Sequence, residues 1–393
     1  MKNSMSTAKN YFSTDFRLGI VGGGQLGKMI LQETRRLDIG TRVLDPSTDA
    51  PCRIGCNEFT VGSLQDYDTV YQFGQNCDVI TIEIENVNTE ALKQLQSEGK
   101  KVYPQPEIIE LIKNKINQKD FYRKNLIPTA EYIAFENLSE LKGAMGEERL
   151  HFPFVWKQAT GGFDGRGVAV IRSAEDLNKL PQEAPCLAES LVPFEKEIAV
   201  VVARSASGET RSFPTVEMDF HPEANLVEFV FSPGKLSQEV SDAAQKLARD
   251  VAEKLGVVGI LAVEMFLTKE GVLLINEVAP RVHNSGHLSI EGNLSSQFEQ
   301  HVRAVLDLPL GHTDTIQAAV MVNLVGEEGY TGPVHYQGIE EIMALSGVYV
   351  HLYGKAETRP FRKMGHVTII DPDLEKARSK AKVVKETIKV ISL

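Results

Sequence analysis

Apolar and polar residues alternate in short blocks over the first third of the chain. Three apolar runs, Leu18–Val21, Arg42–Leu44 and Val79–Ile82, have the length and composition of strands buried in a parallel sheet. The stretch Gln25–Leu37 follows the first run and predicts a helix, and Lys101–Tyr103 predicts a further strand. This alternation of strands and helices predicts a doubly wound α/β domain.

The pattern changes in the rest of the chain. Residues 107–125 are predicted to be helical, strands around a glycine-rich turn follow between 153 and 203, and a helix is expected over 237–255. Beyond about residue 311 short strands dominate, with a final helix at 373–386. We therefore expect a loose extension at 1–15, an α/β domain at 16–115, a central domain at 116–310 with a lid-like module at about 153–203, and a mostly-β domain at 311–393.

The composition is that of an ordinary globular protein. The 393 residues, of which 42% are hydrophobic and 24% charged, predict two or three domains. The formal net charge of −11 disfavours general nucleic-acid binding, and the lack of an apolar run of about 18 residues disfavours a membrane span. Residues 1–10 lack the apolar core of a secretory signal. The four cysteines have no CxxC spacing, so we expect reduced thiols in a cytoplasmic protein rather than a zinc or disulfide framework.

Two glutamates lie on one predicted hairpin in the central domain. The apolar runs 261–267 and 272–277 flank a turn that contains a glycine, which is typical of antiparallel strands. We expect Leu267 to pair with Val272. In this register Glu264 lies opposite Ile275 and diagonal to Glu277, on the same face of the sheet. Diagonal neighbours lie roughly 7–8 Å apart at the backbone, close enough for two carboxylates to share a cation.

The polar residues of this hairpin suggest a metal and an anion. Two carboxylates that project together from apolar strands repel each other unless a cation or a proton lies between them. Asn276 adds a neutral oxygen ligand beside Glu277, which suits Mg²⁺ bound to substrate phosphates, although both carboxylates could also edge a solvated sheet. The run that follows offers donors for a developing anion in Arg281, His283 and Asn284, although such a run can also be a polar loop that ends a strand.

A first glycine-rich turn predicts an anion site near the N-terminus. Gly22, Gly24 and Gly27 follow a strand and begin a helix, and Asp45 ends the next strand. This is the dinucleotide fingerprint and suggests an NAD-dependent dehydrogenase. Its physical basis supports only a phosphate close to backbone N–H groups, and no obvious hydride-transfer machinery follows.

A second glycine-rich turn predicts a nucleotide site. The turn Thr160–Gly167 follows Lys157 and precedes the strand Val168–Ile171. Its glycines allow a loop that closes over phosphates, with backbone N–H groups and Arg166 as donors. An ordinary flexible hairpin is the alternative, and the charged strand ends nearby favour the nucleotide site.

Together these motifs resemble one family. The hairpin with Glu264 and Asn276–Glu277 is similar to the metal-binding end of ATP-grasp ligases. Its continuation, Ala279–His287, resembles the 5-(carboxyamino)imidazole ribonucleotide synthetases of purine biosynthesis, and the resemblance covers nearly the whole chain from Phe16 onward. Its other markers are Gly22–Gly27, Thr160–Gly167 and Arg359–His366.

The resemblance implies an ATP-grasp fold with an N-terminal Rossmann-like domain and a small, mostly-β C-terminal domain. It also implies an ATP-dependent carbon–nitrogen ligase that carboxylates 5-aminoimidazole ribonucleotide with bicarbonate, through carboxyphosphate, and releases ADP and phosphate. The expected metal is Mg²⁺, with Mn²⁺ as an alternative, and a cytoplasmic homodimer is expected. The nearest alternative is a formate-dependent glycinamide ribonucleotide formyltransferase of the same fold. A non-catalytic nucleotide-binding regulator would need a lost metal carboxylate, and both are present.

The resemblance further implies roles for individual residues. The metal ligands are Glu264 and Glu277, and the residues of carboxyl transfer are Arg281, His283 and Asn284. The nucleotide-site residues are Lys115, Lys157, Gly162, Phe163, Asp164, Gly165, Arg166, Gly167, Val168, Glu189, Ser190, Leu191, Val192, Glu197, His221, Asn276 and Glu277. The ribonucleotide-site residues are Gly24, Gln25, Leu26, Glu83 or Glu85, Asp164, Lys355, Arg362 and Lys363. The family usually has Tyr where this sequence has Phe163, so a hydroxyl contact to the acceptor is missing or replaced by water.

Overall fold

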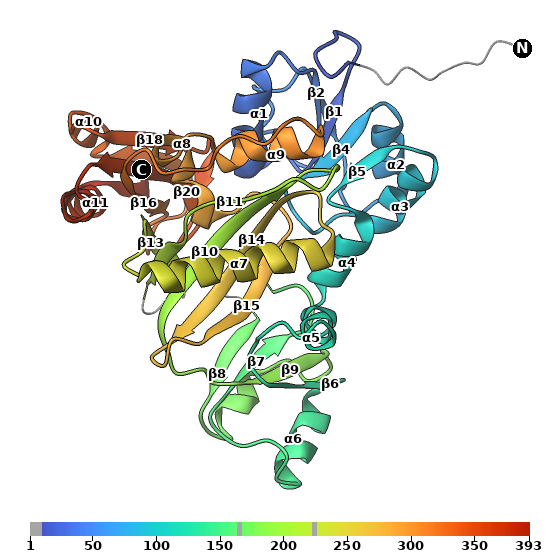
Figure 1. The fold of residues 1–393 in the computed structure, drawn as a ribbon, viewed down its shortest axis with the longest axis vertical. Coiled ribbons are helices and arrows are strands. Elements are labelled where there is room, and N and C mark those ends of the chain that lie inside the picture. The colour runs from blue at the N-terminus through green and yellow to red at the C-terminus, as the bar shows by residue number, and fades with distance from the viewer. Residues whose placement is uncertain (1–9, 163–166, 222–225) are drawn as a thin grey trace, which may run out of the picture.

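The N-terminal part of the chain forms the predicted doubly wound α/β domain. The computed structural model describes residues 10–162, 167–221 and 226–393, and Figure 1 shows their arrangement. Five parallel strands lie in the order β3-β2-β1-β4-β5, of which only β3 has no counterpart in the sequence-based prediction. The elements are β1 (Leu18–Val21), α1 (Gln25–Arg36), β2 (Thr41–Asp45), β3 (Glu58–Val61), α2 (Tyr67–Gln75), β4 (Val79–Ile82), α3 (Thr89–Ser97), β5 (Lys101–Tyr103) and α4 (Pro106–Lys113).

One large antiparallel sheet connects the central and C-terminal parts of the chain. Its main path runs β15-β14-β10-β12-β13-β16-β20-β18, with β11 paired to β10. The C-terminal strands therefore continue the central sheet. Its strands are β10 (Phe194–Arg204), β11 (Thr210–Ser212), β12 (Val216–Phe220), β13 (Val227–Ser232), β14 (Gly259–Thr268), β15 (Leu273–Ala279), β16 (Ala318–Val325), β18 (Val348–Leu352) and β20 (Lys363–Asp371).

A small four-stranded sheet contains the segment predicted as a lid-like module only in part, since its strand Tyr132–Phe135 lies before residue 153 and residues 194–203 belong to the large sheet. It lies at the opposite end of the molecule from the N-terminal domain, below the large sheet in Figure 1. The order is β6-β9-β7-β8, with β6 (Tyr132–Phe135), β7 (Phe154–Gln158), β8 (Val168–Ile171) and β9 (Cys186–Ser190). The helix α6 (Leu138–Gly146) and the short η1 (Asp176–Lys179) pack against the sheet. Together they enclose a separate apolar core around Trp156 and Phe154.

Local capping explains where the helices begin. The region predicted as one helix over 107–125 is two helices, because the Asn114 side chain accepts hydrogen bonds from the N–H groups of Ile116 and Asn117 and starts α5 (Lys115–Lys124). The Ser237 side chain caps α7 (Gln238–Leu255) in the same way, by accepting from the Val240 N–H. No helix in the described part of the chain is long and apolar enough to cross a bilayer.

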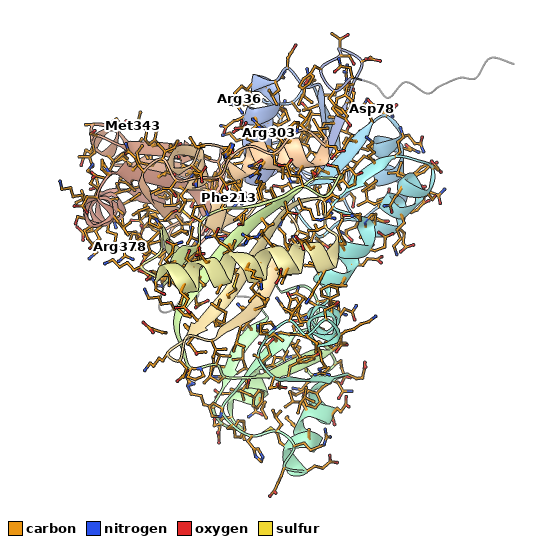
Figure 2. The ribbon with its side chains drawn as sticks, viewed as in Figure 1. Arg36, Asp78, Phe213, Arg303, Met343 and Arg378 are labelled. Atoms are coloured by element: carbon orange, nitrogen blue, oxygen red, sulfur yellow. The ribbon has the colours of Figure 1, made fainter. Side chains whose placement is uncertain are left out.

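The helix α9 (Gln297–Val305) joins the N-terminal domain to the large sheet. It lies beside α1 in Figure 1, and a shared apolar core contains Ile30 of α1, Ile260 of β14 and Val302 of α9. Glu299 of α9 pairs with Arg36 and Arg303, which are labelled in Figure 2, at 2.8 and 2.5 Å. The remaining elements are η2 (Asn284–Gly286), α8 (Ser289–Gly292), β17 (Gly332–Gln337), α10 (Ile339–Met343), β19 (Glu357–Thr358), α11 (Leu374–Thr387) and β21 (Lys389–Ser392).

Candidate active site at the carboxylate hairpin

The hairpin β14–β15 forms as predicted but in a different register. Leu267 pairs with Leu273 rather than with Val272, because the turn is closed by a hydrogen bond from the Thr268 N–H to the Val272 carbonyl at 3.0 Å. A β-bulge at Asn276 then shifts the pairing by one residue. The predicted diagonal placement is therefore wrong, and the two glutamates face each other directly.

Glu264 and Glu277 are cross-strand partners with opposite electrostatic environments. Burial, together with the negative charge of Glu277, raises the pKa of Glu264. The ammonium group of Lys115 lowers the pKa of Glu277 and forms a short ion pair with it. The charge of Glu277 is thus balanced by Lys115, while the ionised form of Glu264 is destabilised. A cation between the two carboxylates would relieve the repulsion between their negative charges.

The donor set around these carboxylates fits a hard divalent cation. Glu264, Glu277 and Asn276 supply oxygen atoms only, which is the ligand chemistry that Mg²⁺ prefers. The described residues contain no group of three or more His, Cys, Asp or Glu side chains suited to a metal. Two carboxylates are enough for Mg²⁺, because this ion usually keeps several water or phosphate ligands.

Lysines from α5 and the small sheet approach the same hairpin. Lys157 of β7 is 6% exposed, donates to the Asn276 side chain at 2.8 Å and pairs with Glu189 at 3.1 Å. Lys119 of α5 pairs with the other oxygen of Glu189, also at 3.1 Å, and donates to Thr129 at 2.5 Å. The small sheet, α5 and the carboxylate hairpin therefore meet in one charged cluster.

Lys119 is a charged residue of this cluster that the sequence-based prediction missed. It is 2% exposed, and burial lowers its pKa to about 8 in spite of the nearby Glu189. Burial would by itself raise the pKa of Glu189, but Lys157 and Lys119 lower it. The missed signal is the spacing of Lys115 and Lys119, since residues four apart lie on one face of a helix.

The rest of the predicted nucleotide site lies on β10 and on the segment that leads into it. Burial raises the pKa of Glu197 on β10 to about 7, while the positive charge of Lys157 opposes this rise and the negative charge of Glu277 adds to it. The segment Glu189–Val192 connects the small sheet to β10, with its Ser190 N–H bonded to the Glu131 carbonyl at 2.9 Å.

The glycine-rich turn is described only at its two ends. Gly162 precedes the gap, and after it the Gly167 carbonyl accepts from the Gln158 N–H at 2.8 Å while Val168 pairs with Lys157. Phe163, Asp164, Gly165 and Arg166 lie outside the described residues. His221 lies against Phe361 of the C-terminal segment, with ring centroids 6.1 Å apart.

The three residues predicted for carboxyl transfer lie on one turn but face different partners. Arg281 pairs with Glu85 at 2.8 Å. The Nε2 atom of His283 lies 3.6 Å from Glu264. Asn284 is 7% exposed, and its amide exchanges two hydrogen bonds of 2.8 Å with Asn323 of β16. His283 is thus beside the carboxylate pair, whereas the Asn284 side chain fixes the turn to the C-terminal strands.

The N-terminal glycine turn is filled by the protein's own carboxylates. The Gly23 N–H donates to Asp45 at 2.7 Å, and the Gly27 N–H donates to Glu83 at 3.2 Å. A Cβ on Gly24 would lie 2.5 Å from the Glu83 carboxylate, so this glycine is needed for close approach. Gln25 begins α1 at this point, followed by Leu26. The fingerprint thus predicts a real anion cradle, but the residues that occupy it disfavour a dinucleotide phosphate in the same place.

The C-terminal basic residues gather in the segment between β18 and β20. Lys355 donates to the Lys363 carbonyl at 2.7 Å, and Arg362 donates to the Glu357 carbonyl at 2.6 Å. The positive charge of Lys363 also acts on Glu264 and opposes the rise of its pKa. The basic segment therefore contributes positive charge that acts on the carboxylate hairpin.

Comparisons with known proteins cover almost the whole chain. Family models match a ribonucleotide synthetase preATP-grasp domain at residues 16–113, an ATP-grasp domain at 120–298 and a phosphoribosylaminoimidazole carboxylase C-terminal domain at 319–380. The N5-carboxyaminoimidazole ribonucleotide synthase of Bacillus subtilis is 37% identical over 357 residues, which cover 90% of this chain and 91% of that protein. The phosphoribosylaminoimidazole carboxylase of Saccharomyces cerevisiae is 38% identical over 364 residues, but these cover only 63% of its length and 90% of this chain.

Solved structures agree with these matches. The N5-carboxyaminoimidazole ribonucleotide synthetase of Thermotoga maritima has a TM-score of 0.88 at 41% identity, over 96% of this chain and 100% of that one. The N5-carboxyaminoimidazole synthase of Aspergillus clavatus, solved with ADP and 5-aminoimidazole ribonucleotide, has a TM-score of 0.87 at 32% identity, over 95% of this chain and 98% of that one.

Proposed function

Since the chain belongs to the N5-carboxyaminoimidazole ribonucleotide synthetases of the ATP-grasp superfamily, we infer that it is an ATP-dependent ligase of purine biosynthesis. It converts 5-aminoimidazole ribonucleotide, with ATP and bicarbonate, to N5-carboxyaminoimidazole ribonucleotide. The observation that carries this function is the pair Glu264 and Glu277, which face each other across one hairpin beside three lysines, in a chain whose family matches lie between residues 16 and 380. The further carboxylase activity in the names of the longer fungal relatives is not part of this proposal.

The nucleotide is proposed to lie between the small sheet and the large sheet. Lys115 and Lys157 are close to the carboxylate hairpin and can neutralise phosphate charge. Glu197 lies on the neighbouring strand β10, and its carboxyl oxygens can accept hydrogen bonds from ribose hydroxyls. The Aspergillus clavatus relative was solved with ADP, which supports a nucleotide site in this fold.

A divalent cation, Mg²⁺ in our proposal, is held by Glu264 and Glu277 with Asn276 as a neutral ligand. When bound, it supplies positive charge that stabilises the phosphates during transfer. Lys115 would then share Glu277 with the cation, and the pKa of Glu264 would fall because its charge is balanced.

The chemistry is proposed to proceed in two displacements. A bicarbonate oxygen attacks the γ-phosphorus of ATP, the bond from that phosphorus to the β-phosphate oxygen breaks, and carboxyphosphate and ADP result. The exocyclic amine of the ribonucleotide then attacks the carboxyl carbon of carboxyphosphate, or of CO₂ released from it, the carbon–oxygen bond to phosphate breaks, and the proton of the amine passes to the released phosphate. Arg281 and His283 lie at the end of β15, where they can bind the negative charge of the carboxylated intermediate.

The ribonucleotide is proposed to bind between the N-terminal glycine turn and the C-terminal basic segment. Lys355, Arg362 and Lys363 provide the positive charge that a phosphate requires in a chain of net charge −11. Of the two candidate glutamates, Glu83 is bonded to the Gly27 N–H and borders the glycine turn, whereas Glu85 is paired with Arg281 and borders the transfer residues.

The decisive experiment measures ADP release with bicarbonate and 5-aminoimidazole ribonucleotide, each omitted in turn. We expect release to depend on both and to yield the carboxylated ribonucleotide. Release that depends instead on formate and glycinamide ribonucleotide would identify the formyltransferase. We also propose a homodimer, which sedimentation would test. A cytoplasmic location is proposed as well, supported by the four free thiols.

A further inference from the structure

The turn that carries His283 is held by a side chain outside the predicted site. Gln297 is the first residue of α9 and is fully buried. Its Oε1 accepts from the His283 backbone N–H at 2.9 Å, and its Nε2 donates to the His283 carbonyl at 2.7 Å. One amide therefore satisfies both backbone groups of His283, as a neighbouring strand would.

The same amide fixes the residues that follow. Its Nε2 lies 3.0 Å from Nδ1 of His287. A Cβ on Gly286 would lie 2.5 Å from the Gln297 Oε1, so a side chain at this position would displace the amide from the turn. Ser289 donates to the Gly286 carbonyl at 2.5 Å and accepts from the Gln297 N–H at 2.9 Å. The turn is thus wrapped around one side chain, and a shift of that side chain moves His283.

The position of the His283 backbone decides where its imidazole lies. Nδ1 accepts from the Ser285 N–H at 3.4 Å and lies 3.0 Å from the Ser285 hydroxyl. Because an N–H can only donate, Nδ1 is the acceptor, and the neutral ring carries its proton on Nε2. That nitrogen lies 3.6 Å from Glu264, so the backbone turn aims a donor at the carboxylate hairpin.

We propose that Gln297 is a positioning residue for carboxyl transfer, which acts through the backbone of His283. The proposal rests on the proposed function, since it assigns Gln297 a part in the work of His283. Misplacement of a reacting group by about 1 Å can cost on the order of a hundredfold in rate. Loss of the amide should therefore lower kcat and leave the KM for ATP unchanged.

The same helix offers a matched control. Gln300 is also fully buried, accepts from the Gly311 N–H at 3.0 Å and donates to the Gly311 carbonyl at 2.6 Å. It makes the same two-point contact with a backbone, but in the loop that follows α9 rather than in the turn of His283. The variants Gln297→Leu and Gln300→Leu therefore remove equivalent backbone contacts from the full chain, at different distances from the chemistry.

The test combines steady-state kinetics, thermal unfolding and a double-mutant cycle. We expect Gln297→Leu to lower kcat about a hundredfold and Gln300→Leu by no more than about threefold, with similar losses of Tm. In a His283→Ala background, Gln297→Leu should lower kcat no further, because its effect passes through His283. The isosteric Gln297→Glu keeps the acceptor for the His283 N–H and provides a folded variant if the leucine variant aggregates.

Three results would overturn the proposal. These are equal losses of kcat in the two leucine variants, an unchanged kcat when Gln297 is replaced by Leu or Glu, and a full further loss in the His283→Ala background. Failure of the proposed function is distinct from these, because the wild-type protein would then release no ADP in response to bicarbonate and 5-aminoimidazole ribonucleotide.

Discussion

Replacing Glu277 by Gln should separate the catalytic role of the carboxylate hairpin from its structural one. The change removes the partner of Lys115, but the Glu277 side chain is 42% exposed, and loss of a solvent-accessible ion pair commonly costs only about 1 kcal/mol or less. It also removes the negative charge that raises the pKa of Glu264, and Lys115 interacts with Glu264 as well. Loss of the ion pair destabilises the protein, whereas relief of the repulsion on Glu264 stabilises it. We therefore expect the free energy of unfolding to fall by about 1 kcal/mol or less.

The effect on activity should be much larger. Two carboxylates balance the charge of a divalent cation. One carboxylate and a neutral amide balance only half of that charge, so the cation is no longer held in its correct position beside the phosphates. We expect at least a hundredfold loss of turnover, which corresponds to about 2.7 kcal/mol at about 1.36 kcal/mol per decade. The rise in Tm on adding Mg²⁺ and ATP should also shrink, because a ligand at a hundred times its Kd stabilises by about 2.7 kcal/mol and a weaker ligand by less.

The assay is ADP release at ordinary Mg²⁺ concentration, with thermal unfolding in parallel. Glu270→Gln is the matched control, because Glu270 is an exposed glutamate in the turn of the same hairpin. The control should retain near wild-type activity. Near-normal turnover by Glu277→Gln would refute the assignment of this carboxylate to the metal, and a large loss of Tm would show that its role is mainly structural.

Three further predictions concern other parts of the site. Arg362→Ala should raise the KM for 5-aminoimidazole ribonucleotide about 10- to 100-fold and leave the KM for ATP unchanged, because a charge-assisted hydrogen bond contributes about 1.5–3 kcal/mol. Arg359 is exposed, and the control Arg359→Ala should change neither KM. Burial raises the pKa of Glu197 to about 7, so the folded protein keeps a proton that the unfolded chain releases. Glu197 should therefore lower the free energy of unfolding as the pH rises from 4.5 to about 7, and denaturant titrations of Glu197→Gln should lack this contribution to the slope. Gly24→Val should displace the Glu83 carboxylate and weaken ribonucleotide binding rather than ATP binding, and calorimetry that finds tight NAD binding to the wild-type protein would contradict this account of the turn.

Sequence patterns predicted the helices and strands of this fold better than the register in which the strands pair. The hairpin follows from two apolar runs around Gly271. The bulge at Asn276 leaves no mark in that pattern, because a run with one extra residue still has the composition and the usual length of a strand. The break between α4 and α5 has a visible signal in Asn114, a residue favoured at helix starts, which the helical periodicity on both sides obscured.

The contents of the site were harder to predict than its location. The glycine spacing indicates an anion cradle, and the family resemblance assigns Glu83 or Glu85 to the same site, but no local pattern indicates that Glu83, 56 residues from Gly27, itself fills the cradle. The contact of Gln297 with His283 depends on how α9 packs beneath the turn, which is a tertiary arrangement. Local patterns thus identify groups that can bind anions, whereas long-range packing decides which of them face a ligand and which face each other.

The continuity of the large sheet also determines which pieces of this protein can exist alone. Phe229–Ser232 of β13 pairs with 319–322 of β16, so a chain that ended before β16 would expose an open strand edge. The apolar Val230 and Phe231 would become accessible at the same edge, and such edges recruit strands from other molecules and promote aggregation. The segment matched by the C-terminal family model, 319–380, therefore marks a unit of shared ancestry, while the unit of folding extends across its boundary into the central domain.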